Sequence, residues 1–76
     1  MIGDNIKFYR KKNQLTQDDI AEACNVTRQA VSKWENGESL PTVDNLYALS
    51  RLLHTSVDDI LIGEKERDDE PSLFFF

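Results

Sequence analysis

Apolar and polar residues alternate with a helical period along most of the first 63 residues of the chain. Apolar side chains recur three and four positions apart, the spacing that places them on one face of an α-helix. Five such stretches are separated by short breaks, at about residues 2–13, 17–24, 28–36, 43–53 and 57–62. The pattern therefore predicts a small all-α domain built from five helices.

Residues with strong terminal preferences mark the breaks between the first four stretches. Thr16 can cap the second helix through its hydroxyl, and Asp19 adds negative charge near the positive end of that helix. Asn25 tolerates the left-handed conformation that a sharp reversal requires. Thr27 is expected to cap the third helix and Gly37 to end it. Two short helices joined by a tight turn follow from these positions.

The apolar stripe of each helix defines an expected core. Ala21 is small enough to let a neighbouring helix cross closely, and Trp34 is assigned to packing rather than to stacking on a base. The expected core consists of Ile2, Ile6, Tyr9, Ile20, Ala21, Cys24, Val31, Trp34, Val43, Leu46, Leu49, Leu52, Leu53, Val57 and Ile60. Such a core would close around the third helix while leaving its other face outside.

The outer face of that third helix carries Arg28, Gln29, Ser32 and Lys33. All four side chains can form hydrogen bonds with base edges or phosphates in a DNA major groove. Gln29 suits a bidentate contact with adenine, whereas Arg28 suits either guanine or a phosphate, and the sequence leaves that choice open. An ordinary solvent-exposed helix face is the alternative. The concentration of four groove-compatible side chains favours DNA contact.

Three motifs, LTQDDIA, VTRQAVSKWENGESLP and VDDILIGE, carry a family resemblance. With these motifs in register, the chain resembles the Cro and lambda-repressor type of helix-turn-helix, or xenobiotic-response-element family, from about Ile2 to Gly63. The resemblance implies a compact five-helix fold, binding to a double-stranded DNA operator as a homodimer, and regulation of transcription, with repression as the default outcome.

The resemblance also extends the set of expected site residues. It implies a bracing role for Gln17 and backbone contacts for residues after the third helix. By their positions at helix starts, the Gln17 amide and the capping hydroxyl of Thr27 could each reach a phosphate. The expected DNA-binding residues are Gln17, Thr27, Arg28, Gln29, Ser32, Lys33, Asn36 and Ser39. Exposed helix positions, capping alone and turn chemistry are the alternatives. The family pattern further implies a structural ion pair between Arg10 and Glu35.

The formal net charge of −5 opposes DNA binding, since cationic side chains supply most phosphate affinity. The charge is unevenly distributed, however. Residues 1–37 contain six basic and five acidic side chains, a net charge of +1, whereas residues 38–76 contain three basic and nine acidic ones, a net charge of −6. Exposed charges more than about 8 Å apart are largely screened at physiological salt. We expect a modest, salt-sensitive affinity.

Residues 64–76 differ in composition from the predicted 1–63 domain. Residues 64–70 are all charged, which is typical of a solvated or disordered stretch, and the chain then ends in three phenylalanines. The expected dimer contacts are Leu61, Ile62, Leu73, Phe74, Phe75 and Phe76. A competing interpretation is a protein-interaction module, antitoxin-like or an adaptor, that binds a partner through this tail. A tail that docks on its own domain is a third.

Composition argues against several other functions. Seventy-six residues bury only about 60% of their unfolded surface, which leaves little room for a catalytic cleft, so no enzyme activity is expected. Cys24 and His54 stand in different helices, and a zinc site needs about four ligands, so we expect no metal and no cofactor. One cysteine excludes an internal disulfide. No long apolar span is present, and a cytoplasmic protein without membrane contact is expected.

Overall fold

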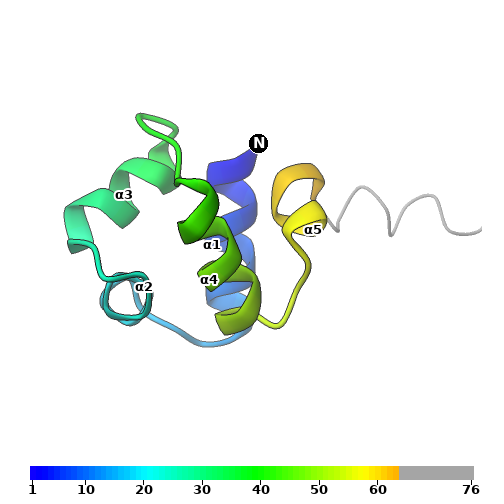
Figure 1. The fold of residues 1–76 in the computed structure, drawn as a ribbon, viewed down its shortest axis with the longest axis horizontal. Coiled ribbons are helices and arrows are strands. Elements are labelled where there is room, and N and C mark those ends of the chain that lie inside the picture. Colours follow the sequence, from blue (N-terminus) through cyan, green and yellow to red (C-terminus); the bar gives the residue numbers. More distant parts are fainter. Residues whose placement is uncertain (64–76) are drawn as a thin grey trace, which may run out of the picture.

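A computed structural model describes residues 1–63 of the chain, and five helices make up most of this part. They are α1 (Ile2–Lys12), α2 (Gln17–Cys24), α3 (Arg28–Asn36), α4 (Val43–Leu52) and α5 (Val57–Ile62). Residues 1–63 contain no strand, so the predicted all-α, five-helix fold is confirmed. The helices α2 and α3 lie at one end of the molecule and α5 at the other, with α1 and α4 between them (Figure 1).

Four of the helices begin at a hydroxyl side chain that accepts a hydrogen bond from a backbone N–H three residues further on. The capping residues are Thr16, Thr27, Thr42 and Ser56. At Thr16 the bond is reciprocal, because the Asp19 carboxylate also accepts from the Thr16 backbone N–H at 2.9 Å. Each cap satisfies a donor that the helix itself cannot use. The predicted helix starts are therefore confirmed by the local hydrogen bonding.

The reversals before and after α3 use left-handed backbone conformations. Asn25 has φ 58° and ψ 47°, which lets α2 end and the chain turn directly into α3. Gly37 has φ 80° and follows the last residue of α3. Both positions were predicted from residue type, since Asn and Gly adopt this conformation at the lowest cost. These two turns set where α3 begins and ends.

The core lies between the five helices, where α1 packs against α3 and α5, α2 packs against α3 and α4, and α4 packs against α5. Its buried apolar residues are Ile6, Tyr9, Ile20, Ala21, Cys24, Val31, Trp34, Leu49, Leu53 and Ile60. Ile2, Leu46 and Leu52 are only partly buried at its margin. The prediction for Val43 was wrong, because its side chain is 81% exposed in the first turn of α4. Leu61, one of the expected dimer contacts, lies on the surface at 41% exposure.

Two close contacts of α1 were not predicted. A Cβ at Gly3 would lie 2.3 Å from the Trp34 carbonyl oxygen, so only glycine lets α1 approach the end of α3 this closely. Asn5 is buried and donates a hydrogen bond to the Ile60 carbonyl oxygen at 2.7 Å. The first helix therefore fixes both the end of α3 and the last helix.

The predicted segment of residues 64–76, with the dimer candidates Leu73, Phe74, Phe75 and Phe76, lies outside the described residues. The boundary proposed at residue 63 therefore stays a prediction. Among the helices of residues 1–63, none is long and apolar enough to cross a membrane.

Candidate nucleic-acid interface

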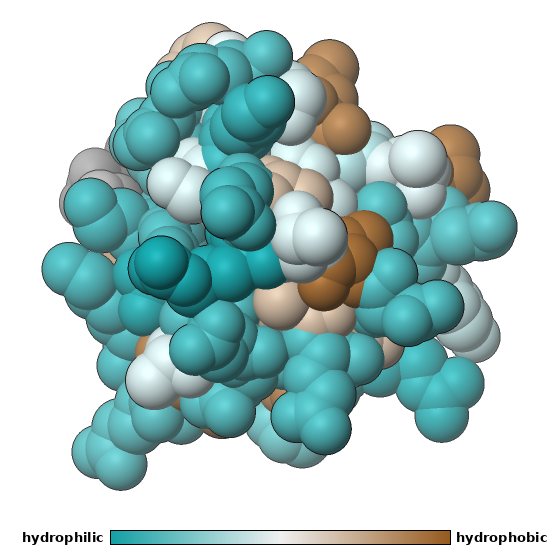
Figure 2. All heavy atoms as spheres, turned by 90° about the vertical axis from the view of Figure 1, so that its left-hand side faces the viewer, coloured by the Kyte–Doolittle hydropathy of each residue, from teal (hydrophilic) through white to brown (hydrophobic). Residues whose placement is uncertain are grey.

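The outer face of α3 is polar and open to solvent. Arg28, Gln29 and Lys33 are exposed and Ser32 is half-buried. Val31 and Trp34, on the opposite face of the helix, are buried in the core. The view onto the end of the molecule that holds α2 and α3 shows a mainly hydrophilic surface with few apolar patches (Figure 2). The α3 side chains are therefore free to contact a polar partner.

A buried carboxylate fixes α3 to the rest of the domain. Glu35 has a side chain that is only 3% exposed, and it accepts from Arg10 Nε at 2.7 Å and Arg10 Nη2 at 3.2 Å. Arg10 Nη1 donates to the Leu15 carbonyl oxygen at 3.0 Å. The structure thus brings Arg10 and Glu35 together in a bidentate ion pair, the geometry in which a guanidinium binds a carboxylate most strongly.

Gln17 joins the same network from the first turn of α2. Its Nε2 donates to Glu35 Oε1 at 3.1 Å, so the side chain bridges α2 and α3. An amide nitrogen carries two N–H donors, and this bond uses one of them. The position of Gln17 is therefore compatible with both roles expected for it, bracing α3 and contacting a phosphate.

Arg28, the first residue of α3, lies beside Asp18 of α2. The distance from Arg28 Nε to Asp18 Oδ1 is 3.8 Å, which is an ion pair too long for a hydrogen bond. Both side chains are exposed, at 62% for Arg28 and 79% for Asp18. Asp18 was not among the predicted site residues. Its nearness to Arg28 depends on the turn between the two helices, which the helical period alone does not specify.

The remaining predicted site residues lie around the two ends of α3. The Thr27 hydroxyl accepts from the Ala30 backbone N–H at 3.1 Å, so its capping role is present. Asn36 and Ser39 are exposed at the other end of the helix. The backbone N–H of Ser39 donates to the Lys33 carbonyl oxygen at 3.4 Å, which holds the loop against the end of α3. The expected DNA-binding residues therefore lie on or next to one helix.

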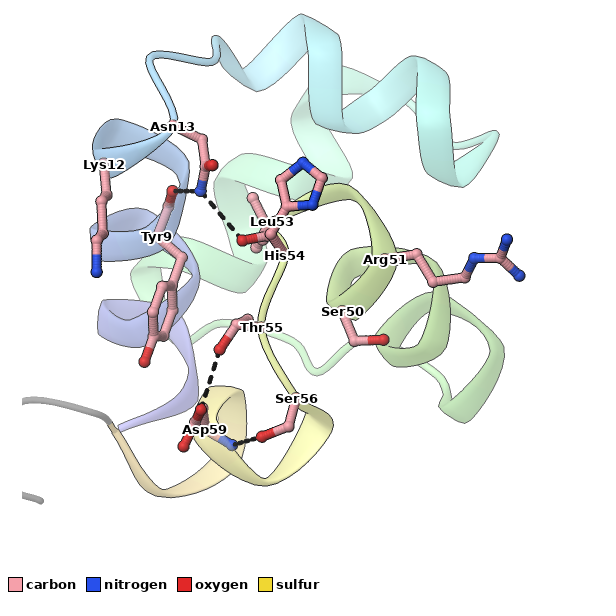
Figure 3. A pocket seen from close by; sticks show the side chains of 10 residues that line it. All are labelled: Tyr9, Lys12, Asn13, Ser50, Arg51, Leu53, His54, Thr55, Ser56 and Asp59. Atoms are coloured by element: carbon pink, nitrogen blue, oxygen red, sulfur yellow. Dashed lines mark hydrogen bonds between the residues drawn. The ribbon is translucent and has the colours of Figure 1, made fainter.

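Outside the α3 face, several reactive side chains of residues 1–63 are buried or bonded to neighbouring residues. Burial raises the pKa of the Cys24 thiol, which keeps it protonated and makes it a poor nucleophile. A cleft of about 810 Å³ lies between α1, α4 and α5. In this cleft the Thr55 hydroxyl donates to the Asp59 carboxylate at 3.2 Å, and the Ser56 hydroxyl accepts from the Asp59 backbone N–H at 3.0 Å (Figure 3). The Arg51 side chain points away from Tyr9. In residues 1–63 no three His, Cys, Asp or Glu side chains are grouped to hold a metal ion.

Similar proteins include regulators whose structures have been solved with DNA. The chain is 40% identical over 70 residues to the HTH-type transcriptional regulator DicA of Escherichia coli, an alignment that covers 92% of this chain and 52% of DicA. The chain thus spans about half the length of that relative. It spans only 30% of the repressor protein C2 of Salmonella phage P22, to which it is 36% identical.

This chain covers a larger share of similar chains with solved structures. A crystal structure of the P22 c2 repressor in complex with a synthetic operator is similar with a TM-score of 0.78 and 36% identity, over 83% of this chain and 96% of that one. The biofilm regulator SinR, known from Bacillus subtilis, was crystallised in complex with DNA and matches with a TM-score of 0.71 and 34% identity, over 80% of this chain and 98% of that one. The family model described as helix-turn-helix matches residues 6–60, most of the chain. This protein belongs to the helix-turn-helix family.

Proposed function

We propose that this protein is a sequence-specific transcriptional regulator that binds double-stranded DNA and reads the major groove with α3. The observation that carries the proposal is the outer face of α3, where Arg28, Gln29 and Lys33 are exposed. The same helix is fixed from behind by the Arg10, Glu35 and Gln17 network. A firmly held helix with exposed polar side chains is what base recognition requires, because the side chains must meet base edges in a fixed register.

The expected contacts divide by position along the helix. Arg28, Gln29 and Ser32 are close enough to its start to meet base edges, since recognition helices use mainly their N-terminal residues for this purpose. Gln17 and Thr27, at the starts of α2 and α3, would contact phosphates through an amide and a hydroxyl. Lys33, Asn36 and Ser39 would complete the contacts further along α3 and in the loop after it.

The regulator would act as a homodimer on a pseudo-palindromic operator. Two protomers would place their α3 helices in successive major grooves, about 34 Å apart. Repression would follow from occupation of the promoter. The P22 c2 repressor, whose chain is covered to 96% by the match, was crystallised in complex with a synthetic operator, which supports operator binding by this fold.

The decisive experiment is selection of bound sequences from a random DNA pool, followed by binding measurements on the selected duplex. We expect enrichment of a two-part site with half-sites one helical turn apart. Replacing Gln29 and Lys33 together by alanine should reduce affinity for that duplex by at least about a hundredfold, since a base contact and a charge contact are lost in each protomer. The circular dichroism spectrum should stay that of the wild type.

The matched control is Arg51→Ala, which removes one positive charge from an exposed residue in the last turn of α4. This variant should bind within about twofold of the wild type. If the double variant keeps wild-type affinity, α3 is not the reading helix. If no sequence is enriched from the pool, the protein does not recognise DNA by sequence.

A further inference from the structure

The ion pair between Asp18 and Arg28 lies within the proposed reading surface. Arg28 is the first residue of α3, and Asp18 is the second residue of α2, next to Gln17. Arg28 Nε lies 3.8 Å from Asp18 Oδ1, and both side chains are mostly exposed. The pair is therefore accessible to a docking nucleic acid, unlike the buried pair between Arg10 and Glu35.

The atom that faces Asp18 determines which donors of Arg28 stay available. A guanidinium presents five N–H donors in a planar fork, one on Nε and two on each terminal nitrogen. Bidentate recognition of guanine needs two parallel donors aimed at the O6 and N7 acceptors. The shortest contact of the Asp18 carboxylate is with Nε, and the Arg28 side chain is 62% exposed. The pair thus holds the guanidinium from its Nε side and leaves most of the Arg28 side chain accessible to a base edge.

Asp18 also opposes a phosphate as an alternative partner of Arg28. A phosphate that approached this guanidinium would come close to the Asp18 carboxylate, and two negative charges repel each other. The oxygen and nitrogen acceptors of guanine carry no net charge, so this cost is much smaller for a base edge. The neighbouring carboxylate therefore favours one of the two contacts that the sequence left open for Arg28.

We propose that Asp18 is a positioning residue that directs Arg28 to a guanine of the operator rather than to a phosphate. The inference rests on the proposed DNA-binding function and adds a specificity determinant to it. An exposed ion pair has a modest energy, so the effect on base preference should be about two- to fivefold. A change of that size is measurable as a ratio of affinities, although it would leave the fold unaffected.

The test measures base preference on the duplex that the wild-type protein selects from a random pool. Each guanine of that duplex is replaced in turn by the other three bases, and affinities are measured for the wild type, Asp18→Asn, Arg28→Ala and the double variant. Arg28→Ala should abolish the preference for one guanine in each half-site. Asp18→Asn should reduce the preference for that same guanine two- to fivefold, and should have no further effect when Arg28 is already alanine.

The matched control is Glu22→Gln, which removes one negative charge from the same helix at an exposed residue with no ion pair to another described residue. Both carboxylate variants should bind all DNA somewhat more tightly, but only Asp18→Asn should change the base ratio. An unchanged ratio in Asp18→Asn overturns the inference, as does an equal change in Glu22→Gln or a change that persists without Arg28. A wild-type protein that selects no sequence overturns the proposed function as well, so the two failures are distinguishable.

Discussion

Among single residues, Glu35 carries a buried carboxylate that is stable only with its hydrogen-bond partners. It is buried near the C-terminal end of α3, where the helix dipole adds negative potential. Arg10 supplies the compensating charge and Gln17 a further donor, and each comes from a different helix. The carboxylate therefore connects α1, α2 and α3, and it sets the position of the helix that carries the proposed contacts.

Glu35→Ala should strongly destabilise the domain. The substitution leaves the guanidinium of Arg10, whose side chain is only 12% exposed, without its carboxylate. Breaking a buried pair by removing one partner costs roughly 3–5 kcal/mol, and for a domain of this size each kcal/mol lowers the melting temperature by about 4–8 °C. We expect a decrease of more than about 10 °C, measured by circular dichroism at 222 nm.

The control for that measurement is Glu38→Ala, since Glu38 is an exposed residue of the loop after α3. Its melting temperature should stay within about 3 °C of the wild type, because surface substitutions usually change stability by less than 0.5 kcal/mol. Equal melting temperatures for Glu35→Ala and the wild type would show that the buried pair does not stabilise the fold.

At the scale of elements, the turn between α2 and α3 determines where the proposed reading helix starts. Asn25 occupies it with φ 58°, and its backbone N–H donates to the Glu22 carbonyl oxygen at 3.3 Å. A β-carbon in this conformation costs roughly 1–2 kcal/mol unless the residue is Asn or Asp. Asn25→Ala should therefore lower the free energy of unfolding by about that amount, measured in urea.

Asn25→Gly separates backbone strain from side-chain loss. Glycine adopts the left-handed conformation without cost, although it also gives the unfolded chain more freedom. The free energy of unfolding of Asn25→Gly should therefore remain within about 1 kcal/mol of the wild-type value. If the glycine variant is as unstable as the alanine variant, the turn depends on the asparagine side chain rather than on its backbone conformation.

The helices were predictable from the sequence because their signals are local. Caps such as Thr16 and Thr27 act within three residues, and the apolar period of α3 correctly placed Val31 and Trp34 inside. Val43 was wrongly placed in the core because the helical period shows which face of a helix is apolar, but not how far along that face the neighbouring helices make contact. The contact of Asn5 with Ile60 spans 55 positions in the sequence, and no local pattern indicates it.

The same distinction applies to the candidate site. The outward positions of Arg28, Gln29 and Lys33 follow from the helical period, which is local. The hydrogen bond of Gln17 to Glu35 and the nearness of Asp18 to Arg28 depend on how α2 crosses α3. A crossing geometry is set by many weak side-chain contacts together. The sequence therefore predicts the reading face better than the residues that position it.

At the scale of the whole molecule, the ends of the domain differ in character. The helices α2 and α3 present a polar surface, whereas α5 at the opposite end exposes Leu61 at 41% and Ile62 at 52% (Figure 1). Ile62→Asp should weaken the proposed dimer, because a charge would have to be buried between protomers. Light scattering over a concentration series should then show the monomer mass where the wild type shows a dimer.

Val43→Asp is the matched control for the dimer, since Val43 is 81% exposed in the first turn of α4. An acidic residue there is favoured by the helix dipole and should not disturb the fold. If Val43→Asp produces monomers and Ile62→Asp does not, the protomers meet at α4. If both variants remain dimers, neither surface forms the contact.

Charge distribution is a property of the entire chain, and it predicts how DNA binding should respond to salt. Each phosphate neutralised by a lysine or arginine contributes about −0.9 to the slope of log K against log salt concentration. If Lys33 contacts a phosphate in both protomers, Lys33→Ala should make the slope less negative by about 1.8. Arg51→Ala, in the half of the chain with a net charge of −6, should leave it unchanged. Fluorescence anisotropy between 50 and about 300 mM salt measures both slopes. An unchanged slope in Lys33→Ala would show that Lys33 does not neutralise a phosphate, so that it contacts a base edge or lies away from the DNA.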